Sequence, residues 1–154
     1  SSTPDTAEQT SAPVESRTSG NVATVTAGDM DSRKLPPELT DPKSILSKRS
    51  VYFDYDKFDI KAEYKDLVAA HAKYLVNNRS FKMLIQGNTD ERGSREYNLA
   101  LGQKRAEAVS RALGLLGVPT AQMEAVSFGK EKPAMAGGSE DARAENRRVE
   151  LSYR

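Results

Sequence analysis

The sequence predicts one domain of the α+β class, with the element order β-α-β-α-β-β. Segments rich in aromatic and β-branched residues alternate with two stretches of helical periodicity, and two further strand-like segments close the chain. Helices that connect strands of one sheet act as crossovers, so both are expected on the same face. The prediction is therefore a two-layer sandwich, in which two helices cover one face of a four-stranded mixed sheet.

The large aromatic side chains are confined to the later part of the chain. All six Tyr and four Phe residues lie between Tyr52 and Tyr153. Because a core is stabilised by the burial of large apolar side chains, residues 44–154 are expected to form the folded domain. Residues 1–43 are rich in Ser, Thr, Pro, Ala and acidic residues, and are expected to form a flexible, disordered tether.

The first part of the domain predicts a strand, a helix and a second strand. Residues 50–55 are aromatic and β-branched, which is typical of a strand. Asp59 can cap a helix that begins at Ile60 and ends near Asn77. The apolar stripe of this helix consists of Ile60, Tyr64, Leu67, Val68, His71 and Leu75. Residues 81–86 predict the second strand.

A second, longer helix follows a polar loop at residues 87–93. Ser94 is a suitable N-cap, and Glu96 lies in the first turn, where the helix dipole favours an acid. Gly117 marks the end of this helix, near Leu116.

The last third of the domain predicts two more strands. Residues 123–128 and 148–153 alternate apolar and polar side chains, as half-exposed strands do. Between them, residues 129–138 predict a loop and residues 140–144 a short helical turn. Together these segments complete the four-stranded sheet.

Composition and charge exclude several classes of function. The net charge is +1 and basic residues alternate with acidic ones, so no nucleic-acid partner is expected. The chain has no Cys, which excludes disulfides and thiolate zinc sites. It has no apolar run near the ~20 residues of a membrane helix and no signal peptide, so a processed form is expected. No nucleotide-binding glycine motif is present, and no cofactor or metal is expected.

A charged residue on the apolar face of the second helix points to a binding site. A helical wheel places Arg105 in the middle of the face that includes Tyr97 and Leu101, with Asn98 almost directly above it. A buried guanidinium needs a partner, and Asp90 in the preceding loop is the obvious candidate. One interpretation is an internal salt bridge that only orders the loop.

The other interpretation is a ligand site. An arginine and an acid side by side match a ligand that carries a carboxylate and an ammonium on one carbon, because arginine grips carboxylates in two-pronged fashion. The site would then recognise a zwitterionic amino-acid head.

Residues 87–106 closely resemble the signature of OmpA-like domains, whose pattern is T-D-x-x-G-x-x-x-x-N-x-x-L-x-x-x-R-A. The variant G-N-T-D-E-R-G is similar to that of the peptidoglycan-associated lipoproteins (Pal) within this family. Residues 51–57 and 145–150 also fit, so the resemblance covers residues 48–154. It implies the OmpA-like fold.

The resemblance also implies a function that is not enzymatic. The expected ligand is the diaminopimelate-containing stem peptide of peptidoglycan, bound noncovalently at the periplasmic face of the outer membrane by a protein with an N-terminal lipid anchor. A TolB-like periplasmic protein is the expected partner, in a Tol-Pal system that serves cell envelope integrity and cell division. OmpA C-terminal domains and flagellar stator domains share the signature and are alternatives. The residues implied at the binding site are Asp90, Arg105, Thr89, Asn98, Asp54, Tyr55 and Arg147.

Three other features suggest different chemistry. Asp54 and Asp56 form the D-x-D of haloacid-dehalogenase phosphatases, as nucleophile and acid/base with magnesium, but Lys57-Phe58 departs from that motif. Together with Asp59 they could suggest a calcium loop, although the loop glycine and the late Glu are missing. His71, the single histidine, is expected to be a packed structural residue.

Overall fold

The computed structural model describes residues 35–154, in which Pro36–Tyr153 form one compact unit. Most of the predicted tether therefore lies outside the described residues. Its last part is folded: helix α2 (Pro37–Thr40) buries Leu39 completely, and the Arg49 guanidinium donates to the Leu39 carbonyl. The domain boundary expected at residue 44 is thus wrong, because one apolar side chain in this polar segment reaches the core.

The four strands form one mixed sheet in the order β1-β4-β2-β3. Strands β2 and β3 pair in parallel, whereas β4 pairs antiparallel with both β1 and β2. The strand bounds are Ser50–Tyr52 for β1, Met83–Asn88 for β2, Met123–Gly129 for β3 and Arg148–Tyr153 for β4.

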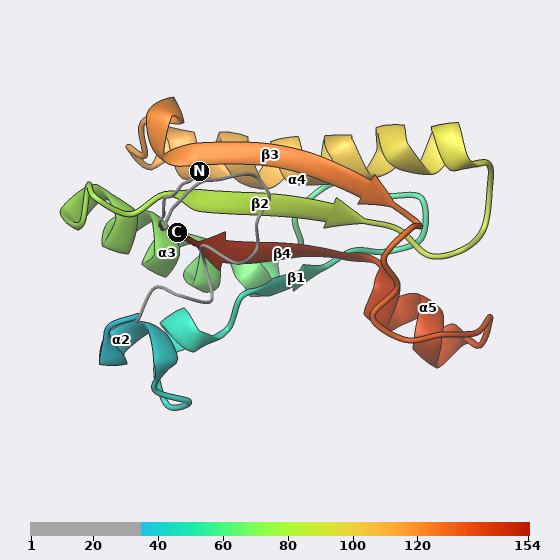
Figure 1. Ribbon diagram of the computed structural model, residues 1–154, viewed down its shortest axis with the longest axis horizontal. Coiled ribbons are helices and arrows are strands. Elements are labelled where there is room, and N and C mark those ends of the chain that lie inside the picture. The colour runs from blue at the N-terminus through green and yellow to red at the C-terminus, as the bar shows by residue number, and fades with distance from the viewer. Residues whose placement is uncertain (1–34) are drawn as a thin grey trace, which may run out of the picture. The chain divides into compact units, whose positions relative to one another are not determined.

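Two long helices cover one face of this sheet (Figure 1). Helix α3 (Lys65–Asn77) and helix α4 (Arg95–Leu115) contact each other, and α4 packs on β2 and β3. The short helix α5 (Glu140–Asn146) connects β3 to β4 at one end of the sheet (Figure 1). The predicted two-layer α+β architecture is confirmed. None of the helices in residues 35–154 has the length and apolar character required to cross a bilayer.

The core lies between the sheet and the two helices. Alternate residues of β2 and β4 point into it, and α3 and α4 contribute the facing side chains. Burial of each such aliphatic side chain stabilises the fold by roughly 1.5–3 kcal/mol. The side chains with no exposed surface include Val51, Leu75, Ile85, Val109, Leu113 and Val149.

His71 is buried in this core and serves packing. Its Nε2 lies 2.8 Å from the Lys48 carbonyl, which can only accept, so Nδ1 accepts from the Tyr153 hydroxyl at 2.5 Å. Burial lowers the pKa of His71, so the ring is neutral at physiological pH. The structural role expected for this histidine is confirmed.

The second strand is shifted by two residues from its predicted range, and the two largest differences from the sequence prediction lie before it. Strand β1 ends at Tyr52, and the chain turns at Asp54–Lys57, where Asp56 has a φ of 58°. The first helix begins with a 3₁₀ turn, η2 (Ala62–Tyr64), and its α-helical part starts only at Lys65. Asp59 therefore caps no helix. A tertiary contact explains why the chain turns after β1: the Asp54 and Lys57 carbonyls accept hydrogen bonds from the buried Arg105 of α4. Ser94, by contrast, caps α4 as predicted: its Oγ accepts from the Tyr97 amide at 3.0 Å.

Short helical turns were also missed. They are η1 (Ile45–Ser47) and η3 (Thr120–Gln122). Each is a single turn, too short for a periodic pattern to reveal it.

Backbone atoms of α4 and β2 meet at two glycines. A Cβ atom on Gly87 would lie 1.8 Å from the Gly102 carbonyl oxygen, and one on Gly102 would lie 2.3 Å from the Ser127 Oγ. Only residues without a side chain allow this separation. The contact holds the first half of α4 against the end of β2, where the candidate site lies.

Gly87→Ala is expected to lower the free energy of unfolding by about 3 kcal/mol, because the new methyl group meets a backbone carbonyl that cannot rotate away. Gly114→Ala, in α4, is the matched control. Its Cβ would lie 3.9 Å from the Met123 methyl group, an ordinary contact, and alanine should stabilise the helix by about 1 kcal/mol. Urea unfolding measures both, and equal stability of the two variants would contradict the close approach.

Candidate functional site

Arg105 is the largest of the fully buried side chains, with no exposed surface. Its Nε donates to the Lys57 carbonyl at 2.7 Å, Nη1 to the Asn88 carbonyl at 3.0 Å and Nη2 to the Asp54 carbonyl at 3.1 Å. Burial lowers the pKa of Arg105 to about 10, so the guanidinium stays charged at neutral pH. The buried cation is thus held by main-chain dipoles, and no carboxylate of residues 35–154 is in direct contact with it.

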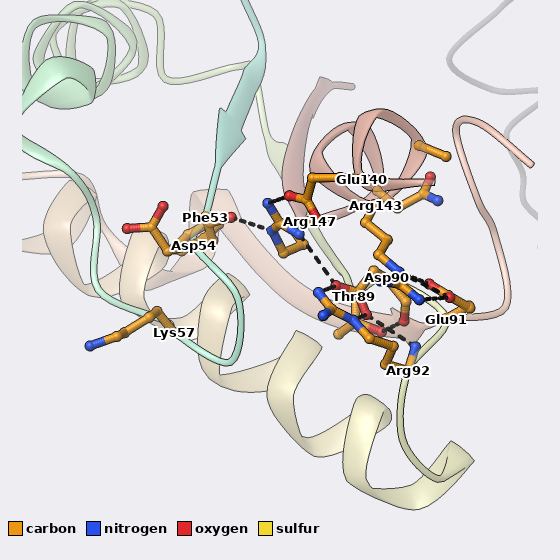
Figure 2. Close-up of polar contacts among 12 residues, drawn as sticks. Phe53, Asp54, Lys57, Thr89, Asp90, Glu91, Arg92, Glu140, Arg143 and Arg147 are labelled. Atoms are coloured by element: carbon orange, nitrogen blue, oxygen red, sulfur yellow. Dashed lines mark hydrogen bonds and ion pairs between the residues drawn. The ribbon is translucent and has the colours of Figure 1, made fainter. Parts of the chain in front are cut away.

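Asp90 follows β2 and is only 4% exposed. The Arg92 amide donates to Oδ1 at 3.0 Å, the Arg92 Nη2 donates to Oδ2 at 2.8 Å, and the Arg147 Nη1 lies 3.5 Å from Oδ2 (Figure 2). Burial raises the pKa of Asp90, but the bonds from the two arginines lower it further, so the net shift is downward. The carboxylate is therefore ionised.

Arg147 connects three parts of the fold around this carboxylate. Its Nε donates to the Phe53 carbonyl at 2.9 Å and its Nη2 to Glu140 at 3.0 Å (Figure 2). A second ion pair, between Arg143 and Glu91 at 2.8 Å, joins α5 to the same loop. Helix α5 is thereby fixed against the loop that carries Asp90.

A pocket of about 130 Å³ opens beside these groups, between the 54–57 turn, the loop after β2 and the first turns of α4. Its lining contains five of the seven residues expected at the site: Tyr55, Thr89, Asp90, Asn98 and Arg105. Among the described residues no ion pair joins Asp90 to Arg105, so the direct salt bridge considered from the sequence is not formed. Both groups lie at the pocket.

The other two expected residues, Asp54 and Arg147, are not part of the lining. The Asp54 carboxylate faces solvent and pairs with Lys61 at 3.0 Å, while its carbonyl accepts from Arg105. Arg147 contacts Asp90 from the side of α5. Both residues thus contact residues of the pocket lining without being part of the lining themselves.

Two of the expected residues in the lining, Thr89 and Asn98, hold the loop itself. The Thr89 hydroxyl donates to the Asp90 carbonyl at 3.0 Å. The Asn98 side-chain amide donates to the Arg92 carbonyl at 2.8 Å, which ties the loop to the first turn of α4. The backbone on either side of Asp90 is thus fixed by side chains of the same site.

Sequence reasoning missed several lining residues, above all Arg92 and Tyr97. The helical wheel predicts Tyr97 on the apolar face of the helix, but its side chain is 51% exposed and its hydroxyl donates to Asp56. Arg92 lies over the Tyr55 ring, with its Cζ 3.8 Å from the ring centroid. A local signal existed for Arg92, since a cation two residues after an acid in a tight loop can reach back to it.

The geometry does not fit the phosphatase or calcium alternatives. Strand β1, which precedes Asp54, is an edge strand paired antiparallel with β4, and the Asp54 side chain pairs with Lys61. Asp56 accepts from Tyr97. Across residues 35–154, no group of three or more His, Cys, Asp or Glu side chains is placed to hold a metal ion.

Known proteins are similar to this chain in sequence and in fold. The model of the OmpA family matches residues 52–147. The peptidoglycan-associated lipoprotein of Haemophilus influenzae is 50% identical over 104 residues, which are 68% of this chain and 68% of that protein. The protein of the same name from Pasteurella multocida is 48% identical over 104 residues, 68% of this chain and 69% of that protein.

Solved structures agree with these matches. The crystal structure of the peptidoglycan-associated lipoprotein from Burkholderia pseudomallei has a TM-score of 0.75 and 60% identity, and the match covers 76% of this chain and 99% of that one. The C-terminal domain of Helicobacter pylori MotB has a TM-score of 0.62 at 22% identity, over 68% of this chain and 81% of that one. The second similarity concerns the fold alone.

The charge network around Asp90 predicts a pH dependence of stability. Because the folded-state pKa of Asp90 lies below its ordinary value of 3.8, its contribution is fully present above that value and is lost as the pH falls through the lowered pKa. Asp90→Asn should therefore cost about 2 kcal/mol of unfolding free energy at pH 6 and much less at pH 2. Urea unfolding at the two pH values measures this.

Glu91→Gln is the matched control for Asp90→Asn. Glu91 is the next residue and also pairs with an arginine, but at an exposed position, so its loss should change stability little. Equal losses in the two variants, or an Asp90→Asn loss that does not depend on pH, would contradict the buried network.

Proposed function

This chain belongs to the OmpA family, and we propose that its pocket binds the zwitterionic head of diaminopimelate in the stem peptide of peptidoglycan. The name of its relatives supports the ligand, since proteins about half identical to this chain are peptidoglycan-associated lipoproteins. The protein associates with peptidoglycan and is not an enzyme.

The observation that carries the proposal is that only three of the N–H donors of Arg105 have acceptors among the described residues. A guanidinium has five N–H donors, and the three hydrogen bonds to main-chain carbonyls engage one on Nε, one on Nη1 and one on Nη2. One N–H on each terminal nitrogen has no protein acceptor among the described residues. Two such donors on adjacent nitrogens match the two oxygens of a carboxylate.

Asp90 supplies the opposite charge on the same pocket. It is ionised and lines the pocket together with Arg105, so a ligand carbon that bears a carboxylate and an ammonium meets both charges. The binding is noncovalent, with an expected dissociation constant of about 1 μM, or roughly −8 kcal/mol. Because the cell wall presents many stem peptides, avidity strengthens the attachment.

The cellular setting follows from the relatives in the same way. Their lipoprotein name supports a lipid anchor on the N-terminal side of the domain. An anchor of this kind holds the domain at the periplasmic face of the outer membrane, and the pocket then links that membrane to the cell wall.

A comparison of two peptides tests the ligand without altering the protein. A stem tripeptide that ends in diaminopimelate should bind at least tenfold more tightly than one that ends in lysine, because the lysine side chain has no carboxylate next to its ammonium for Arg105 to bind. Calorimetry measures both affinities, and equal affinities would defeat the proposal. Asp90→Asn should weaken the binding of the diaminopimelate peptide but not that of the lysine peptide. Glu91→Gln is the control and should change neither affinity.

Arg105→Ala is a poor test of the same point. It would leave three carbonyls of the 54–57 turn and β2 without donors, so lost binding could reflect a lost fold. The peptide pair avoids this problem.

Exposed aromatic side chains around the pocket support a second role, as a contact surface for a TolB-like protein of a Tol-Pal system. Tyr55, Phe58 and Tyr97 are 56%, 47% and 51% exposed. Exposed aromatic groups are enriched at protein interfaces. Because Tyr55 and Tyr97 also line the pocket, the protein partner and the stem peptide would compete.

Phe58 separates the two roles, since it is exposed near the pocket without lining it. Phe58→Ala should weaken binding to the TolB-like protein by about tenfold and leave the affinity for the stem peptide unchanged. Surface plasmon resonance and calorimetry measure the two affinities. A variant that lost both, or neither, would contradict the assignment of Phe58 to the protein interface.

A further inference from the structure

One residue, Arg92, donates to both oxygens of the Asp90 carboxylate. Its amide and its Nε lie 3.0 Å and 3.3 Å from Oδ1, and its Nη2 lies 2.8 Å from Oδ2. A carboxylate offers about four lone-pair directions, and the Arg147 Nη1 at 3.5 Å approaches Oδ2 as well. A ligand ammonium that binds Asp90 must therefore take the place of one of these donors.

The two arginines on Asp90 are held very differently. The Arg147 side chain is 10% exposed and is also bonded to Phe53 and Glu140. The Arg92 side chain is 31% exposed, lines the pocket and rests on the Tyr55 ring. Arg92 is thus the partner that a ligand can displace.

Only the side chain of Arg92 needs to move. Its carbonyl accepts from the Asn98 amide at 2.8 Å, and its own amide donates to Asp90 at 3.0 Å. These two bonds hold the backbone of the loop whether or not the guanidinium stays on the carboxylate. Displacement therefore leaves the pocket wall in place.

We propose that Arg92 is an internal competitor of the ligand ammonium and a determinant of specificity at this pocket. Its guanidinium occupies Asp90 and must be displaced by a cationic ligand group. A lone ammonium replaces one cation by another and gains little. A zwitterionic head also gains the Arg105 donors, which offset the displacement. This inference rests on the proposed function and adds to it the group that the ligand displaces.

Arg92→Gln tests the competition, because it removes the guanidinium and keeps the backbone hydrogen bond to Asp90. The stem tripeptide ending in diaminopimelate should bind about three- to tenfold more tightly to this variant than to the unaltered protein. Arg143→Gln is the matched control. It removes the same charge from the neighbouring pair with Glu91 and should change the affinity less than twofold.

A second measurement uses the unaltered protein and does not depend on how the variant folds. In nitrogen-15 NMR of the arginine side chains, saturation with the tripeptide should shift the Arg92 Nε–H signal and expose it to faster solvent exchange. The Arg147 Nε–H, which donates to Phe53 at 2.9 Å, should keep its protection.

The outcomes separate this inference from the proposed function. If the unaltered protein binds the tripeptide and Arg92→Gln binds it equally or less tightly, or if the Arg92 signal is unchanged at saturation, Arg92 is no competitor while the proposed function stands. If the unaltered protein does not bind the tripeptide at all, the proposed function fails and this inference fails with it.

Discussion

The buried guanidinium of Arg105 is the constraint on which the site depends. A charged group can be buried only where hydrogen bonds replace the water it loses, and here the acceptors are carbonyls of residues 54, 57 and 88. These residues lie on a turn after the edge strand β1 and at the end of the inner strand β2. One side chain of α4 thus fixes both segments, and they become two walls of the pocket.

The two charges of the pocket are balanced in different ways. Arg105 is held by neutral dipoles and keeps its full positive charge, whereas Asp90 is paired with Arg92 and Arg147. Under the proposed function, an incoming carboxylate would meet a cation that pairs with no carboxylate of the described residues, whereas an incoming ammonium would meet an anion that already has partners. This asymmetry would favour a ligand that carries both charges over one that carries only the positive charge.

The fold and the site impose separate requirements on the sequence. The close approach of Gly87 and Gly102 brings the backbones of β2 and α4 together. It positions α4 whichever side chains the helix presents to the pocket. The same fold occurs in a MotB domain at 22% identity, so the architecture alone identifies no ligand. The function has to be argued from Asp90, Arg105 and the groups that hold them.

Local patterns in the sequence determined the order of strands and helices, the Ser94 cap and the central position of Arg105 on its helix, because periodicity and capping depend on near neighbours. They also indicated that a buried arginine needs partners. Only the tertiary structure decided which partners these are, and that Arg92 and Arg147 hold Asp90. It also decided that α3 starts at Lys65. These features depend on contacts between segments far apart in the chain, such as the turn at residues 54–57 and the middle of α4, and no local pattern encodes such contacts.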